Sequence, residues 1–306
     1  MVVRVIGFLV GLGFVVVAAW SLLWGAIGYI GDPPKPTVEH RFHHHPKPLA
    51  LASDGPLGRF DRAQLQRGFQ VYKEVCSACH SIHLVSFRDL ADLGYSEPEV
   101  KAIANQWQIE VPDINPDTGE PATRKALAAD RFPSPYANEV AARAANNNAA
   151  PPDLSLMTKA REGGAAYVHS LLTGYQNPPA NLPKESLPGP NLHYNPYFAN
   201  LNIAMPPPLV AEGQVTFADG TKPTVDQMAK DVSAFLVWTA EPKLENRHRA
   251  GLAVLAFLVI ATILAYLSYR NIWSGMKDRA VRATGPLDPE NMAKREAASR
   301  DAGIEG

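Results

Sequence analysis

The sequence is poor in cysteine, in net charge and in strand-like runs. Its 306 residues include two cysteines, Cys76 and Cys79, so their use in one motif leaves no thiol for a disulfide or a second metal site. The formal net charge of −1 excludes the overall basic character of nucleic-acid-binding proteins. Proline is abundant, with 27 residues. We therefore expect a mainly α-helical, loop-rich protein.

Both cysteines belong to the run Cys76-Ser77-Ala78-Cys79-His80. It reads C-x-x-C-H, the attachment signal of a c-type haem. Two thiols at this spacing reach the two vinyl groups of one porphyrin, and the histidine that follows supplies an axial nitrogen to the iron. The motif predicts one covalently attached c-type haem on Cys76 and Cys79, with His80 as an iron ligand.

Two other interpretations of the cysteine pair fit less well. A zinc site would need a second pair of ligands, and the sequence has no further cysteine. A thioredoxin-type redox pair lies between a strand and a helix. Here residues 60–75 lead into the motif with Leu65, Phe69 and Tyr72 at helical spacing, and Asp61 is placed to cap that helix.

An uncharged apolar run occupies residues 5–30. At about 1.5 Å per residue it can span a bilayer core of about 30 Å. The alternative is a cleaved signal peptide, whose apolar region is about 7–15 residues and is followed closely by a small-x-small cleavage site. This run is longer and no such site follows closely, so we expect a retained transmembrane helix in residues 1–30.

A second uncharged apolar run occupies residues 251–269. Tyr266, Tyr269 and Trp273 lie near its far end, as interfacial aromatics do. We expect a transmembrane helix over residues 250–273 and a cytoplasmic tail over 274–306, disordered from residue 278. The basic residues expected on the cytoplasmic side are Arg270, Lys277, Arg279 and Arg282.

Residues 31–58 contain many prolines, which argue against regular structure, and we interpret them as a linker. His40, His43, His44 and His45 lie within it. A metal site is one interpretation of this cluster. Histidines clustered in a proline-rich linker are more often solvated, with adventitious metal affinity at most.

Residues 59–249 remain for the haem domain. Capping patterns predict its helices, with Ser96 before a helix over 100–107, Asn138 opening one over 138–145, and Thr224 with Gln227 opening one that runs to about residue 240. Asp153 or Ser155 is placed to cap a helix that Gly163 and Gly164 would end.

A haem iron that only transfers electrons needs a second axial ligand, and a methionine thioether raises its potential. The candidates are Met157, Met205 and Met228. Met228 falls on the apolar face of a predicted helix and Met157 lies in a helical frame, whereas three prolines stiffen the chain after Met205. We therefore expect Met205 to be the ligand. A second histidine is the alternative, with His83, His169 and His193 as candidates.

With these motifs in view, the chain resembles the cytochrome c1 family, the haem subunit of the quinol–cytochrome c reductase (bc1) complex. The matching motifs keep the family's order and include residues 67–80, 138–143, 151–155, 167–175, 194–198, 205–208 and 231–242. Where the family often has Asn-Gly-Ala, this chain has Asn147-Asn148-Ala149, and asparagine tolerates the positive φ of such a turn.

The resemblance implies a class I cytochrome c-like haem domain with long loop insertions. Met205 matches the family's axial methionine, and Arg143 matches an arginine that contacts a haem propionate. The remaining residues expected in the haem pocket are Asn146, Pro151, Pro152 and Leu154.

The resemblance also implies a function. Single electrons would pass from a Rieske iron–sulfur subunit to a cytochrome c, with cytochrome b as a further partner, in a dimeric complex. Catalysis would belong to the reductase and not to this chain alone. The membrane would be a bacterial inner membrane with the haem domain in the periplasm, or a mitochondrial inner membrane with the domain in the intermembrane space.

Two other functions stay open. A free-standing, membrane-anchored electron shuttle would carry the same haem. An enzyme with a five-coordinate haem would bind carbon monoxide readily and would not need Met205.

Overall fold

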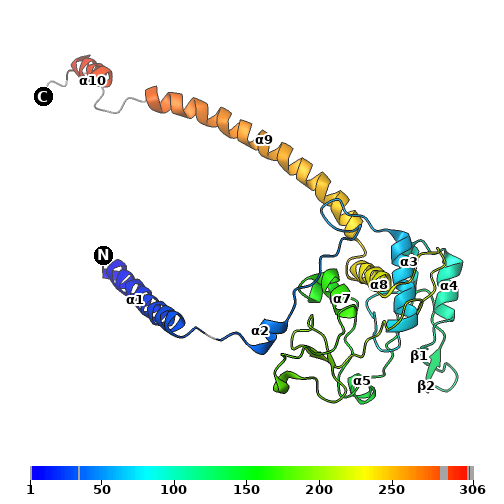
Figure 1. The fold of residues 1–306 in the computed structure, drawn as a ribbon. Coiled ribbons are helices and arrows are strands. Elements are labelled where there is room, and N and C mark those ends of the chain that lie inside the picture. Colours follow the sequence, from blue (N-terminus) through cyan, green and yellow to red (C-terminus); the bar gives the residue numbers. More distant parts are fainter. Residues whose placement is uncertain (1, 34, 283–288, 302, 304–306) are drawn as a thin grey trace. The chain divides into compact units, whose positions relative to one another are not determined.

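The structure is a computed structural model that describes residues 2–33, 35–282, 289–301 and 303, with the backbone alone at 275–282 and 289–290. The described chain is mainly helical and confirms the predicted fold class (Figure 1). Its α-helices are α1 Val2–Gly31, α2 Val38–Phe42, α3 Arg62–Val71, α4 Glu97–Asn105, α5 Glu139–Ala145, α6 Met157–Ala160, α7 Gly164–Leu172, α8 Val225–Ala240, α9 Leu244–Arg282 and α10 Pro289–Asp301. The strands form two antiparallel pairs, β1 Val111–Ile114 with β2 Pro121–Arg124, and β3 His193–Tyr194 with β4 Asn202–Ile203.

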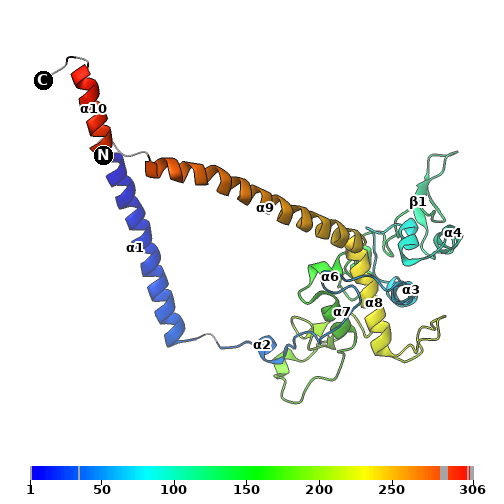
Figure 2. The same ribbon diagram turned by 90° about the horizontal axis from the view of Figure 1, so that it is seen from above.

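The core forms where α3 crosses α8 (Figure 2). Phe69 of α3 and Phe235 of α8 are both buried, with ring centroids 5.7 Å apart. Gly68 lets the helices meet, because a Cβ there would overlap the Asp231 backbone oxygen and lie 2.7 Å from Phe235 Cβ. This contact fixes the helix that leads into the cysteine motif.

A buried carboxylate joins the same two helices. Asp231 on α8 is fully buried and accepts hydrogen bonds from Gln64 Nε2 (2.9 Å), Gln227 Nε2 (2.8 Å) and Arg67 Nε (2.8 Å). Three donors around one carboxylate offset the cost of burying its charge. The α3–α8 crossing therefore has a fixed register.

Aromatic side chains extend the core toward residues 81–135. Phe87 and Phe132 pack with ring centroids 4.1 Å apart, and Trp107 meets both rings edge to face. Residues 115–119 form the tip of the β1–β2 hairpin, where Gly119 has a φ of 71°. The sequence did not predict this hairpin, because its strands are four residues long and largely exposed.

The helix starts predicted at Asp61, Ser96, Asn138 and Thr224 are confirmed. Asp61 accepts from Gln64 N (3.2 Å), Ser96 and Glu99 form a capping box, and Asn138 accepts from Ala141 N (2.9 Å). Thr224 accepts from Gln227 N (3.1 Å), but the Gln227 side chain bonds Asp231 and does not complete the box.

Residues 31–58 are more ordered than the linker interpretation expected. They include α2, whose Val38 and Phe42 pack against a second buried cluster made of Leu182, Tyr194 and Leu201. Thr37 caps this helix by accepting from His40 N (3.2 Å). Prolines flank α2 without interrupting it, and backbone hydrogen bonds from His44 N to Pro196 O (2.8 Å) and from Lys47 N to Ser170 Oγ (2.8 Å) also hold the segment.

The terminal helices agree with the predicted spans. Val2–Gly31 and Leu244–Ser274 are long and apolar enough to cross a membrane, and the apolar 18-residue window within each is not buried inside the structure. Helix α9 begins at Leu244, six positions before the predicted 250, and His248 Nδ1 lies 3.2 Å from Gly58 O.

The tail differs from the expected disorder. Helix α9 continues to Arg282 and α10 occupies Pro289–Asp301, because this part of the chain is rich in alanine, lysine, arginine and glutamate, which favour helix without burial. The side chains of Lys277, Arg279 and Arg282 lie outside the described residues.

We predict that Gly68→Ala destabilises the protein by about 1–3 kcal/mol, the usual cost of overpacking a close contact. Thermal unfolding of the purified protein measures this. Gly189→Ala is the control, because its added Cβ would meet Leu192 Cδ1 at an ordinary 3.9 Å. Equal unfolding temperatures for the two variants would contradict the α3–α8 account.

Candidate haem site

The cysteine motif lies in a tight turn directly after α3. The helix continues as one π-helical turn, Tyr72–Cys76, and Ser77 N bonds Tyr72 O (2.8 Å). His80 N then bonds Cys76 O (2.9 Å), and Tyr72 Oη donates to His80 O (3.0 Å). Because Tyr72 is buried in the core, this hydrogen bond ties the motif to the core of the domain.

The His80 ring is oriented by a backbone carbonyl. Its Nδ1 lies 2.7 Å from Pro152 O, and since a carbonyl only accepts, Nδ1 carries the proton. The other nitrogen, Nε2, then has a free lone pair for a metal. Burial lowers the pKa of His80, and this effect outweighs Pro152 O and Asp153, which raise it. The lowered pKa favours the neutral ring that a metal requires.

Asp153 ties the motif to the segment that holds this carbonyl. Its carboxylate accepts from Ser81 Oγ (2.6 Å), His83 N (2.9 Å) and Ser155 N (2.9 Å), and His83 Nδ1 lies 2.7 Å away. Burial alone would raise the Asp153 pKa, but the hydrogen bonds from Ser155, Ser81 and His83 outweigh it and hold the pKa at about 2.

The predicted capping role of Asp153 and Ser155 is wrong. Helix α6 starts after Leu156 without a side-chain cap. Ser155 Oγ accepts from Leu84 N (3.1 Å), and Leu154 N donates to Ser81 O (2.8 Å) with the Leu154 side chain buried. Asp153 and Ser155 instead bond residues 81–84, directly after the cysteine motif.

The cysteine pair does not resemble a redox-active thiol pair. Burial is the main cause that raises the pKa of the Cys76 thiol to about 12, and the neighbouring Cys79 adds to the effect. Reactive thiols have a lowered pKa. Within the described residues no group of three histidine, cysteine, aspartate or glutamate side chains is placed to hold a metal ion. The raised pKa of Cys76 argues against a reactive thiol pair of the thioredoxin type.

A cavity of about 380 Å³ opens beside Cys79. Pro151, Pro152 and Ala142 line it together with Ser81 and residues 134–139. Proline and alanine surfaces next to an attachment thiol suit a flat apolar porphyrin. The residues present thus fit a haem, and the predicted pocket residues Pro151 and Pro152 lie beside it.

Tyr136 is a cavity residue that the sequence did not reveal. The side chains of Asn146 and Cys79 lie close enough to its hydroxyl to affect the Tyr136 pKa, Asn146 lowering it and Cys79 raising it. Asn146, a predicted pocket residue, also donates from Nδ2 to Ala142 O (2.7 Å). The sequence showed only a rigid proline-flanked run here, and no spacing rule pointed Tyr136 toward the cysteine.

Arg143 has partners within its own helix and turn. It donates to Glu139 Oε1 (2.6 Å from Nη2) and to Asn148 O (2.9 Å from Nη1), and it does not line the described cavity. Asn147 and Asn148 have φ values of 52° and 65°, so the predicted positive-φ turn is confirmed. As it stands, Arg143 stabilises that turn.

The methionine candidates occupy different surroundings. Met228 is fully buried in the α8 core and Met157 packs against the same core, which supports packing roles for both. Met205 is half-buried in the loop after β4, and its carbonyl accepts from Tyr175 Oη (3.0 Å). Among the histidines, His169 Nε2 lies 3.0 Å from Asp226 Oδ1, and His193 lies in β3.

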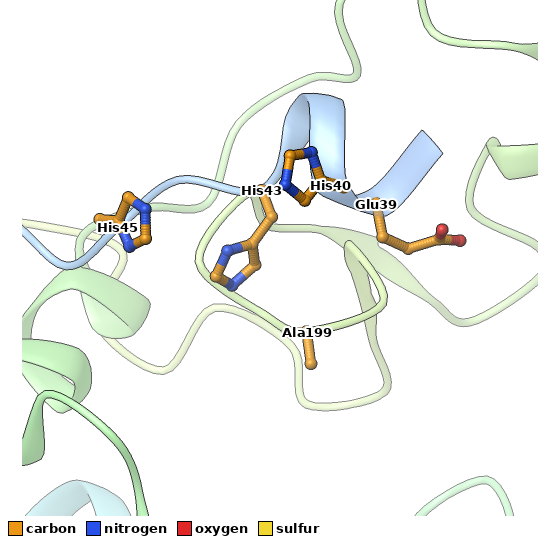
Figure 3. Close-up of a pocket in the computed structure, with 5 residues that line it drawn as sticks. All are labelled: Glu39, His40, His43, His45 and Ala199. Carbon is orange, nitrogen blue, oxygen red and sulfur yellow. The ribbon is translucent and has the colours of Figure 1, made fainter. Parts of the chain in front are cut away.

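The histidine cluster lines a separate cavity of about 350 Å³ (Figure 3). Its walls are Glu39, His40, His43, His45 and Ala199. The rings come from α2 and the extended chain after it, and they do not converge on one point (Figure 3).

Comparison with known proteins shows which family the chain belongs to. The model of the "Cytochrome C1 family" matches residues 51–276. The chain belongs to the cytochrome c1 family. It is 45% identical over 255 residues to "Cytochrome c1-2, heme protein, mitochondrial" of Solanum tuberosum, covering 83% of this chain and 95% of the relative.

Other relatives come from bacteria and fungi. The chain is 45% identical over 235 residues to "Cytochrome c1" of Rhodospirillum rubrum, covering 73% of this chain and 85% of that protein. It is 44% identical over 245 residues to the "Cytochrome b-c1 complex catalytic subunit, mitochondrial" of Candida albicans, covering 79% and 82%.

We predict that the chain loses stability as the pH falls below about 4. An ordinary aspartate has a pKa of about 3.9, so the lowered Asp153 pKa of about 2 stabilises the fold above pH 4 and this contribution disappears as the carboxylate protonates. The difference corresponds to about 2 kcal/mol.

Urea unfolding across this pH range measures the effect. Asp153→Asn should flatten the pH dependence, and Asp117→Asn, in the exposed hairpin turn, should not. An identical acid profile in wild type and Asp153→Asn would contradict the role of this carboxylate.

Proposed function

We propose that this chain is the haem-bearing electron-transfer subunit of a quinol–cytochrome c reductase (bc1) complex, with one c-type haem attached to Cys76 and Cys79. The observation that carries the proposal is the His80 ring, held through Nδ1 by Pro152 O directly after the two cysteines, in a chain of the cytochrome c1 family.

Each residue has a distinct task. The thiols of Cys76 and Cys79 would anchor the porphyrin, and His80 Nε2 and the Met205 thioether would hold the iron. Pro151, Pro152 and Leu154 would shield the site from water. When bound, the haem supplies reversible one-electron chemistry, and two protein ligands leave no position for oxygen or substrate.

The partners follow from the family. Electrons would come from a Rieske iron–sulfur subunit, next to cytochrome b in a dimeric complex, and leave to a cytochrome c. Residues 31–249 contain 24 acidic and 21 basic residues, a net charge of −3. A mildly acidic domain favours a basic acceptor and gives an association rate that falls with added salt.

The proposed topology follows from haem attachment outside the cytoplasm. The haem domain would face the periplasm of a bacterial inner membrane, or the intermembrane space of a mitochondrion. Helix α9 would then carry Arg270 and the chain that follows to the opposite side, as the positive-inside rule prefers.

Gentle solubilisation of the membrane tests the complex. This chain should purify together with a b-type cytochrome and an iron–sulfur protein, and the assembly should oxidise quinol. Full activity of the chain purified alone would support the electron shuttle, and ready carbon monoxide binding would support the five-coordinate enzyme.

We predict that Cys76→Ser or Cys79→Ser abolishes stable assembly of the domain. The motif is bonded to buried Tyr72, and loss of the haem would leave the cavity beside Cys79 unfilled. Haem staining and immunoblotting of membranes measure this, with Ser77→Ala as a control inside the motif. A folded, soluble, haem-free domain would refute the prediction.

We predict that Met205→Leu retains the covalent haem and lowers its midpoint potential, by on the order of hundreds of millivolts, because the thioether ligand raises the potential. Redox titration of the purified complex measures the shift. Met157→Leu, in a similar half-buried setting, should leave the potential unchanged. An unchanged potential in Met205→Leu would point to another ligand.

A further inference from the structure

The loop that carries Met205 is fixed to the end of α7 by one side chain. Tyr175, three residues beyond α7, donates its hydroxyl to the Met205 carbonyl oxygen at 3.0 Å. Its ring packs edge to face against His193 of β3, with centroids 6.5 Å apart. The tyrosine is half-buried, so the hydrogen bond is shielded from competing water.

Other contacts hold the chain on either side of Met205. Upstream, β3 pairs with β4, and buried Asn195 donates from its backbone N to Leu201 O (2.7 Å) and from Nδ2 to Leu171 O (2.8 Å). Downstream, Gln214 Nε2 donates to Pro208 O (2.8 Å).

Between these anchors the backbone depends on Tyr175. Among the described residues, no other hydrogen bond to the backbone of residues 204–207 is seen. Three successive prolines follow Met205 and supply no N–H donors. The prolines make residues 205–208 stiff, and the Tyr175 hydrogen bond to Met205 O is what holds this segment against the end of α7.

We propose that Tyr175 is a positioning residue that holds the Met205 backbone so that the thioether stays on the haem iron. The proposal rests on the proposed function, in which Met205 is the second axial ligand. The Tyr175 phenol carries an O–H and a carbonyl oxygen can only accept, so the tyrosine is the donor in this hydrogen bond.

The consequence is a shift in ligand occupancy. Loss of one hydrogen bond lets the loop move away more often, and an external ligand then competes more successfully for the iron. A typical net hydrogen bond corresponds to a factor of about 2–10 in such an equilibrium. Tyr175→Phe should therefore bind imidazole about 2–10 times more tightly in the ferric state.

The experiment compares Tyr175→Phe with Tyr194→Phe in the purified complex. Tyr194 is a buried tyrosine on β3, and its hydroxyl does not bond Met205. The readouts are imidazole affinity, the long-wavelength methionine-to-iron absorption band and the midpoint potential. Tyr175→Phe should raise imidazole affinity and weaken the band, and Tyr194→Phe should change neither.

Unchanged imidazole affinity and an unchanged band in Tyr175→Phe would overturn the proposal, as would equal changes in Tyr194→Phe. If Tyr175→Phe fails to assemble, Tyr175→Gln carries the test, because its amide keeps a donor. An affinity nearer to wild type than that of Tyr175→Leu supports the proposal, and equality with Tyr175→Leu overturns it.

Failure of the proposed function would look different. Wild-type protein would then lack the methionine band, or Met205→Leu would retain it, whatever the behaviour of the Tyr175 variants.

Discussion

The hydrogen bond between His80 Nδ1 and Pro152 O is the constraint on which the rest of the site depends. It decides the tautomer of the ring and therefore which nitrogen faces a metal. Pro152 suits this task because proline restricts both its own φ and the residue before it, so the backbone that leads to this carbonyl has little freedom. The flanking proline, Pro151, adds to that stiffness, and both line the cavity beside Cys79. The same two residues thus orient the ligand and supply the apolar surface.

Two segments that are about seventy positions apart must stay together for this bond to exist. Asp153 joins these segments, because its carboxylate accepts hydrogen bonds from Ser81, His83 and Ser155. The motif is fixed from its other side by α3, which crosses α8 over Gly68 and the buried Asp231 carboxylate. A loop-rich domain has no long strands to hold residues that are distant in sequence. Here the Asp153 and Asp231 carboxylates, each accepting several hydrogen bonds, hold such residues together.

The sequence predicted what local patterns determine. The cysteine motif, the caps at Asp61, Ser96 and Thr224, the two apolar spans and the positive-φ turn at Asn147 and Asn148 are all local and all present. It did not predict contacts made by loops. Asp153 was predicted to cap a helix because aspartate and serine side chains accept hydrogen bonds from backbone N–H groups both at helix starts and in loops. Tyr136 and Tyr175 carry no spacing signal, and the docking of α2 depends on a cluster formed by residues about 140–160 positions later in the chain.

The most direct test of this account is a density map of the purified, haem-loaded protein at a resolution that places the His80 ring. The account predicts thioether links to Cys76 and Cys79, iron on His80 Nε2, and Nδ1 still within hydrogen-bond distance of Pro152 O. Iron bound to Nδ1, or a ring turned away from Pro152, would contradict it.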